Sequence, residues 1–199
     1  MKRILLLVCL CLVASCGKSS KDVLEIRNVS TVPIQSEFAG LQFAQSYSSI
    51  EIISALQKEF PNYSETIEPK LSEDGSFYSY NLLSLYSGLL FAGERWDFVM
   101  VSTDTDNCFY EVFLSKTYSD KQLEYAESTY KYFSDQLQNK YGKANDWSKN
   151  DLKWSFWTDN ERGVSLQLYD SNHLVLRYYD IDHLANVQSE QEKYIDNQL

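Results

Sequence analysis

The sequence predicts an α+β fold in which two helices are each followed by a meander of antiparallel strands, with a further helix at the C-terminus. Apolar residues recur at helical spacing in residues 49–60 and 119–141, and short alternating segments bounded by turn residues follow each helix. Both helices also open on a Tyr-Ser pair, at residues 47–48 and 118–119. The repeated order leaves two alternatives open, a tandem repeat and a single α+β sheet whose repetition is accidental.

The first helix is predicted over residues 49–60, within the stretch SYSSIEIISALQKEFP. Ser48 and Glu51 have the spacing of a capping box, in which each side chain accepts a hydrogen bond from the other residue's backbone N–H. Pro61 cannot continue a helix and marks its end. The apolar stripe of this helix consists of Ile52, Ile53 and Leu56.

The first set of strands is predicted in the segments LYSGLLF, WDFVMVS and CFYEVFLS, with a further strand at residues 77–83. Apolar residues stand in a row at 99–101, which indicates strands buried on both faces. The hydrophilic residues 63–75 read as a connection. In DTDNC, Asp104 and Asp106 match the first two ligand positions of an EF-hand calcium loop, but the residues at its later positions do not match. A hairpin turn is therefore predicted.

The second helix is predicted to begin at a Ser119 cap with Gln122 three residues later, and to end at Gly142. The strands LKWSFW, GVSLQLYD and HLVLRYYD follow it. Their alternation predicts one apolar face that packs on the helix. This face is predicted to contain Leu152, Trp154, Phe156, Val164, Leu166, Leu168, Leu174, Leu176 and Tyr178.

Three aromatic residues alternate with this apolar face, namely Trp157, Tyr169 and Tyr179. Rings on the opposite face of a sheet suit sugar rings or protein partners, so these are the candidate ligand-facing residues. The alternative is that another part of the protein covers them. The last segment, residues 181–199, has a sparse apolar stripe and is predicted to form a terminal helix.

Catalytic motifs are missing from the sequence. His173 and His183 are the only histidines, and neither belongs to a nucleophile, zinc-protease or phosphate-binding motif. His173 is expected at the start of a strand, and His183 in an acidic cluster at a helix start. Cys108 is expected to be a small core residue, because the body of the chain has no second cysteine to pair with it. We therefore predict no catalytic residue, metal site or cofactor.

The N-terminus has the pattern of an export signal. Lys2 and Arg3 precede an apolar run at residues 4–13, which is shorter than the roughly 20 residues of a membrane-spanning helix. The run ends in Val13-Ala14-Ser15-Cys16, which resembles the lipobox of bacterial lipoproteins. This resemblance implies that the chain is cut before Cys16, and that Cys16 carries a diacylglyceryl group and an acylated amine. In that family, Gly17 favours sorting to the outer membrane.

These patterns divide the chain into four parts. The predicted parts are a lipoprotein signal peptide at 1–15, a lipidated cysteine and tether at 16–36, an α+β domain at 37–180 with halves at 37–116 and 117–180, and a C-terminal helix at 181–199. From residue 38 to 180 the element order is similar to that of tandem helix-plus-meander periplasmic proteins, such as the beta-lactamase inhibitor protein and the assembly-factor lipoproteins of the outer membrane. That similarity implies fold alone.

The net charge of the chain argues against some classes of binding partner. The formal net charge is -10, and loss of the cations Lys2 and Arg3 with the signal peptide makes it -12. Such a domain repels nucleic acid and anionic lipid head groups. We predict a non-enzymatic module, lipid-anchored in the bacterial cell envelope, with a protein or glycan partner. Two alternatives stay open, a carboxylate-dependent glycan hydrolase at the cell surface and a secreted soluble inhibitor or binding domain.

Overall fold

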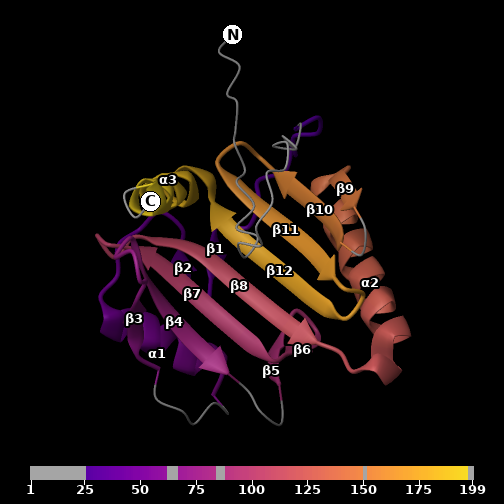
Figure 1. The fold of residues 1–199 in the computed structure, drawn as a ribbon, viewed down its shortest axis with the longest axis horizontal. Coiled ribbons are helices and arrows are strands. Elements are labelled where there is room, and N and C mark those ends of the chain that lie inside the picture. The colour runs from indigo at the N-terminus through magenta and orange to yellow at the C-terminus, as the bar shows by residue number, and fades with distance from the viewer. Residues whose placement is uncertain (1–25, 62–66, 84–87, 150–151, 197–199) are drawn as a thin grey trace.

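The computed structural model describes residues 26–61, 67–83, 88–149 and 152–196. An eight-stranded antiparallel sheet forms its centre, two helices cover one face, and a third helix lies at one end of the other face (Figure 1). This arrangement confirms the predicted α+β class and the C-terminal helix. The predicted signal peptide and Cys16 lie outside the described residues.

The sheet has the strand order β3-β4-β7-β8-β12-β11-β10-β9. Its strands are β3 (Pro69–Leu71), β4 (Phe77–Leu83), β7 (Phe98–Asp104), β8 (Phe109–Thr117), β9 (Asn145–Lys149), β10 (Leu152–Thr158), β11 (Arg162–Tyr169) and β12 (His173–Asp180). Two small hairpins consist of β1 (Glu37–Phe38) with β2 (Leu41–Gln42), and β5 (Leu89–Phe91) with β6 (Glu94–Trp96). The helices are α1 (Ser49–Glu59), α2 (Leu123–Tyr141) and α3 (Ile181–Asp196), and a 3-10 turn, η1 (Asp120–Gln122), precedes α2.

The two halves of the sheet have the same order of elements. In the first, α1 precedes the meander β3-β4-β7-β8, with the β5–β6 hairpin inserted before β7; in the second, α2 precedes the meander β9-β10-β11-β12. The last strands of the two meanders, β8 and β12, pair antiparallel from His173–Thr117 to Tyr179–Glu111. The halves therefore join along their final strands into one sheet.

Both predicted helix starts are confirmed. At α1, the Ser48 hydroxyl accepts from the Glu51 backbone N–H, and the Glu51 carboxylate accepts from the Ser48 backbone N–H at 2.8 Å. Ser119 and Gln122 make the corresponding box, but the first turn there is the 3-10 turn η1 rather than α-helix. Gly142 ends α2 with a φ of 87°, a left-handed conformation that glycine adopts at little cost.

The core lies between the sheet and the helices α1 and α2. Apolar side chains of every central strand point to these helices and are removed from water, which is the main favourable term in folding. The core includes Val99, Val101, Val112, Leu114, Val164, Leu166, Leu168, Leu174 and Leu176 of the sheet, with Ile52 and Leu56 of α1 and Ala126, Phe133 and Leu137 of α2.

The structure corrects the predicted face of β10. Trp157, not Trp154, shares the core face with Val164, because Trp157 pairs with Val164 and Trp154 pairs with Gln167. A one-residue shift in register moves a strand's side chains to the opposite face. The alternation of β10 favours the other set, because Leu152, Trp154 and Phe156 are apolar whereas Lys153 and Ser155 are polar. The tight turn to β11 fixes the register.

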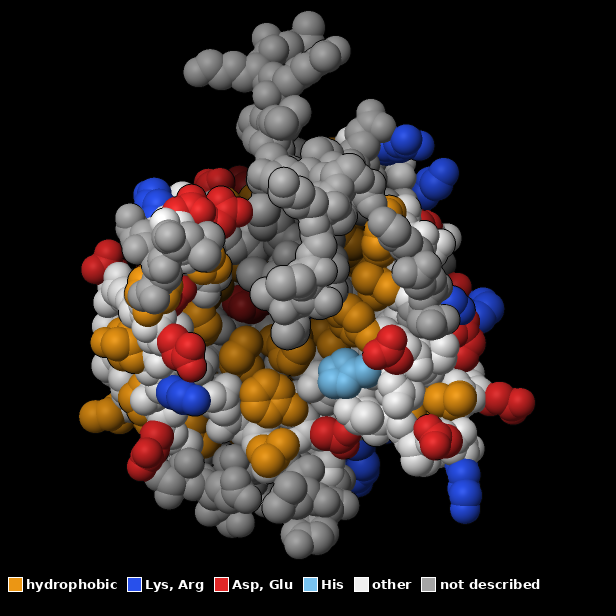
Figure 2. Space-filling model, in the orientation of Figure 1, with side chains coloured by type: hydrophobic (Ala, Val, Ile, Leu, Met, Phe, Trp, Pro, Cys, Tyr) orange, Lys and Arg blue, Asp and Glu red, His pale blue; other side chains and the backbone are white. Residues whose placement is uncertain are grey.

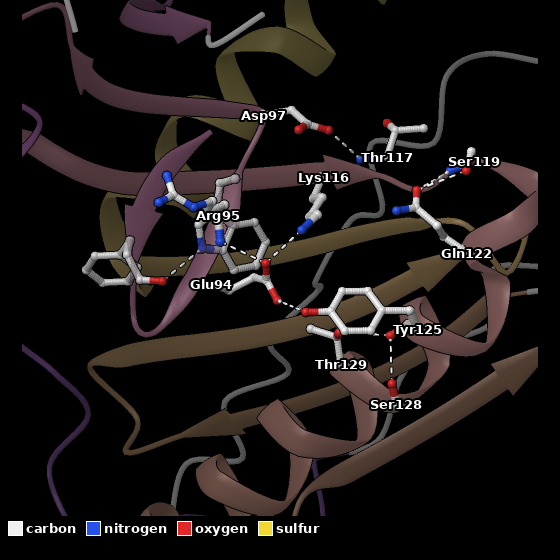
Figure 3. A network of polar contacts seen from close by, with 12 residues as sticks. Glu94, Arg95, Asp97, Lys116, Thr117, Ser119, Gln122, Tyr125, Ser128 and Thr129 are labelled. Atoms are coloured by element: carbon white, nitrogen blue, oxygen red, sulfur yellow. Dashed lines mark hydrogen bonds and ion pairs between the residues drawn. The ribbon is translucent and has the colours of Figure 1, made fainter. Parts of the chain in front are cut away.

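A polar network ties the inserted hairpin to the sheet and to α2 (Figure 3). Glu94 of β6 accepts from Lys116 Nζ of β8 at 2.7 Å and from the Tyr125 hydroxyl of α2 at 3.4 Å. The Lys116 ammonium also lies 4.9 Å from the ring centroid of Tyr118. The Lys116 and Glu94 side chains are only 17% and 13% exposed, so removal of either leaves a partly buried charge without its counter-ion.

We predict that Lys116→Met lowers the free energy of unfolding by about 3 kcal/mol, because Glu94 then stays poorly solvated and unpaired. Lys131→Ala is the matched control, since it removes the exposed pair Lys131–Asp135 on α2 and is expected to change the same quantity by less than about 0.5 kcal/mol. Urea unfolding followed by circular dichroism measures both. Equal changes in the two variants would contradict the role of the network.

Candidate functional site

The candidate site lies on the sheet face opposite α1 and α2. Figure 2 shows this face, with hydrophobic side chains gathered over the central strands and acidic residues around them. The strand registers place Phe98, Met100, Glu111, Phe113, Trp154, Phe156, Gln167, Tyr169, Val175, Arg177 and Tyr179 on it. The face is therefore rich in aromatic residues and holds few charges.

One ion pair occupies the middle of this face. Arg177 of β12 donates from Nε to Glu111 Oε1 of β8 at 2.7 Å, and its Nη2 donates to the same oxygen. The guanidinium carbon lies 5.9 Å from the ring centroid of Tyr179, whose pKa burial raises to about 12. The centre of the face therefore holds one partly buried ion pair beside an aromatic ring.

An apolar groove opens where the C-terminal turns of α3 lie beside β3, β4 and β7. Its cavity volume is about 470 Å³. Phe77 and Met100 line it from the sheet, and Tyr194 and Ile195 line it from α3. Its remaining lining residues are Lys70, Leu71, Ser72, Glu73, Asp74, Ser79, Asn81 and Gln191.

The acidic end of the groove is fixed by the turn before β4. Asp74 Oδ1 accepts from the Ser76 backbone N–H at 3.0 Å and from the hydroxyls of Ser72 and Ser76. Partial burial raises the pKa of Asp74, but these hydrogen bonds outweigh it and the net direction is downward. Asp74 is therefore a fixed negative charge at neutral pH, next to the apolar lining.

The three aromatic residues predicted to face a ligand do not lie on the same face of the sheet. Trp157 is in the core, where it is 1% exposed and its indole N–H donates to the Gly142 carbonyl at 2.9 Å. The prediction for Trp157 is therefore wrong, because the register of β10 turns it to α2. Tyr169 and Tyr179 do lie on the sheet face opposite α1 and α2, where Tyr169 is half-buried and Tyr179 is buried.

Trp154 takes the place predicted for Trp157. Its ring lies against Trp147 and Phe156, with centroid distances of 6.5 and 5.8 Å. It is 4% exposed, and among the described residues no acceptor lies within reach of its indole N–H. Only the register between β10 and β11 identifies Trp154 as a residue of this face, and that register depends on the turn between the two strands.

The structure also brings together Cys108 and His183, which sequence reasoning treated separately. Their Sγ and Nε2 atoms are 3.3 Å apart, and His183 Nδ1 lies 2.8 Å from Asp180 Oδ1. Burial raises the pKa of the Cys108 thiol, as do Asp104 and Asp180. Because the thiolate is the nucleophile, a raised pKa argues against nucleophilic catalysis by this cysteine.

Comparison with known proteins yields no relatives: no protein-family model matches the chain, and no curated protein or solved structure is significantly similar to it. None of the helices in the described ranges has both the length and the apolar character needed to cross a membrane.

We predict that Trp157→Phe and Trp154→Phe differ in stability although both replace the same ring. Trp157→Phe removes a hydrogen bond to Gly142, whereas Trp154→Phe removes a buried donor that has no partner in the described structure. The free energy of unfolding is expected to fall by about 1–2 kcal/mol more in Trp157→Phe. Urea unfolding measures the difference, and an equal or larger loss in Trp154→Phe would refute the assigned register.

Proposed function

We propose that the protein is a lipid-anchored binding module of the bacterial cell envelope. Its partner is a protein, bound in the groove beside α3 and on the adjoining apolar strip, which we define as Phe98, Met100 and Phe113. The observation that carries this proposal is the continuity of the two surfaces. Met100 lines the groove and also pairs with Phe113 across β7 and β8.

The apolar strip has the composition of a protein-binding surface. All three of its side chains are partly exposed, and the rings of Phe98 and Phe113 contact edge to face at 6.2 Å. Beside the strip, Leu71, Tyr194 and Ile195 are 47%, 41% and 58% exposed. Contiguous apolar surface with a polar rim is typical of interaction sites, and aromatic residues and methionine are enriched there.

Charge indicates what kind of protein would bind. The chain has a formal charge of -10, and Glu73 and Asp74 lie at the groove. A partner with basic residues around an apolar contact would be attracted to this surface, while nucleic acid and anionic lipid would be repelled. We therefore favour a basic protein over a neutral glycan.

The described chain begins at the side of the sheet away from the groove. Asn145 Oδ1 of β9 accepts from the Arg27 and Asn28 backbone N–H groups, both at 2.8 Å, and the Ser30 N–H donates to the Thr158 carbonyl of β10. The segment predicted as tether to residue 36 is thus bound to the domain from Arg27 onward. Residues 16–26 would then span at most about 40 Å.

This attachment would separate the groove from the point where the tether leaves the domain. The strand of the groove nearest to β10 is β7, which is four strands away, or about 19 Å at the usual strand spacing. With a tether of that reach, a domain held by Cys16 could place its groove away from the lipid surface. A partner free in the periplasm or outside the cell could then reach it.

Lipidation is tested first with the full-length gene expressed in a bacterium. We expect the mature chain to begin at Cys16 with an added mass of three acyl chains, and to fractionate with membranes, because three chains anchor far more strongly than one. Cys16→Ser is expected to release the protein into the soluble fraction. A wild-type chain with an unmodified Cys16 would favour the secreted soluble alternative.

Binding is tested by a photo-crosslinking amino acid placed at Phe98 or at Tyr194 of the full-length protein in intact cells. Ile50 of α1 is the matched control, since it is apolar and 77% exposed but lies on the helix side. We expect a discrete protein adduct from the groove positions that the Asp74→Lys variant weakens, and none from Ile50. Adducts of equal yield from Ile50, or none from either groove position, would contradict the proposal.

A further inference from the structure

We propose that Asp104, Cys108 and His183 form a Zn²⁺ site, with Asp180 as the partner that orients the histidine. The site is independent of the groove and of the lipid anchor. His183 Nε2 lies 3.3 Å from Cys108 Sγ and 4.0 Å from Asp104 Oδ2, and the three ligand atoms all fall within 4.8 Å of one another.

Three elements that are far apart in the sequence converge at this point. Asp104 ends β7, Cys108 ends the turn that leads into β8, and His183 lies in the first turn of α3. The pairing of β8 with β12 brings the start of α3 to the β7–β8 turn. A metal bound here would join the C-terminal helix to the first half of the sheet.

The turn holds two of the ligands in place. Asp104 Oδ1 accepts from the backbone N–H groups of Asp106 and Cys108, both at 2.9 Å. These bonds engage one carboxylate oxygen and leave Oδ2 directed at His183. Asn107 has a φ of 58°, which lets the chain reverse within the turn and places the Cys108 side chain beside its partners.

Asp180 selects the imidazole tautomer that a metal requires. Asp180 Oδ1 accepts from the His183 backbone N–H at 3.1 Å and lies 2.8 Å from His183 Nδ1. A carboxylate is an acceptor, so the proton of the neutral ring belongs on Nδ1 and the lone pair of Nε2 faces Cys108 and Asp104. Metal-binding histidines typically have such a carboxylate on their other nitrogen.

The ligand set indicates which ion fits. Thiolate, imidazole and carboxylate together suit Zn²⁺, whereas Ca²⁺ and Mg²⁺ prefer oxygen alone. Zinc bond lengths of about 2.0–2.3 Å put tetrahedral ligands roughly 3.3–3.7 Å apart. The His183–Cys108 distance of 3.3 Å already fits, whereas Asp104, 4.0 Å from His183 and within 4.8 Å of Cys108, would need to move towards both. Thiolate and carboxylate would balance the charge of the ion, with the fourth position left to water.

The surroundings also favour a cation. Asp106 and Asp180 add negative charge near the thiol. Cys108 is 8% exposed, while the Asp104 and His183 side chains are 22% and 29% exposed. The ligand atoms are thus shielded from bulk water, yet an ion can enter from the surface.

The test is a Co²⁺ titration of the full-length, reduced protein in detergent, followed by competition with Zn²⁺. We expect the absorption of a thiolate–Co²⁺ bond in the wild type, its loss on adding Zn²⁺, and its absence in Cys108→Ser and His183→Gln. Cys9 and Cys11 are absent from a processed chain and Cys16 then carries lipid; in an unprocessed chain all three remain in Cys108→Ser, so any absorption due to them would persist in that variant. Persistence of the full signal there would overturn the proposal.

Two further variants separate the proposed roles. Asp180→Asn is expected to weaken Zn²⁺ binding roughly 10–100-fold, as loss of an orienting partner typically does. Asp182→Asn removes the same charge from an exposed neighbour and is expected to leave the affinity unchanged. Equal affinities of these variants would contradict the orienting role.

A measurement on the wild type alone covers the case in which Cys108→Ser does not fold. Zn²⁺ is expected to slow alkylation of Cys108, measured by mass spectrometry of its peptide. No slowing at saturating Zn²⁺ would overturn the site.

Discussion

The antiparallel pairing of β8 with β12 is the contact on which the rest of the structure depends. Each half is a four-stranded meander that would by itself end in an exposed edge, and an edge strand leaves backbone donors and acceptors unpaired. The pairing satisfies these groups for both halves and sets Leu176 opposite Leu114 over the helices. On the other face, the Arg177–Glu111 ion pair crosses the same junction, where its geometry fits only this register. The single sheet and the Arg177–Glu111 ion pair therefore both depend on the pairing of β8 with β12.

The junction also places both sites. Because β12 runs antiparallel to β8, α3 begins where the β7–β8 turn lies, and its first turn meets Cys108. The same helix then continues towards β4 and β3, where its last turns form one wall of the groove. The proposed zinc site would therefore hold the N-terminal end of α3 in place. The position of that end sets where the C-terminal turns of α3 meet the groove. Recognition and metal binding are separate proposals, but they use two ends of one helix.

Much of the fold can be predicted from local sequence patterns, whereas the positions of the site residues depend on the register of the strands. The capping residues Ser48 and Ser119 and the turn residue Gly142 locate the helices, since capping depends on neighbours in sequence. Trp157 was misplaced because the alternation of β10 favours Trp154 and Phe156 as the core face, and only the pairing with β11 shows that Trp157 faces the helices. Cys108 and His183 are 75 residues apart and meet through the junction of the two halves, which no local pattern reports.

We expect the two halves to unfold together, as one cooperative sheet joined through β8 and β12. Native-state hydrogen exchange measures this cooperativity most directly, because the slowest amides exchange only through global unfolding. We predict that amides of β8 and β12 are the most protected, and that the strands of both halves share one free energy of opening. Exchange of the β9–β12 half at a distinctly lower free energy than the β3–β8 half would show independent units and contradict the account.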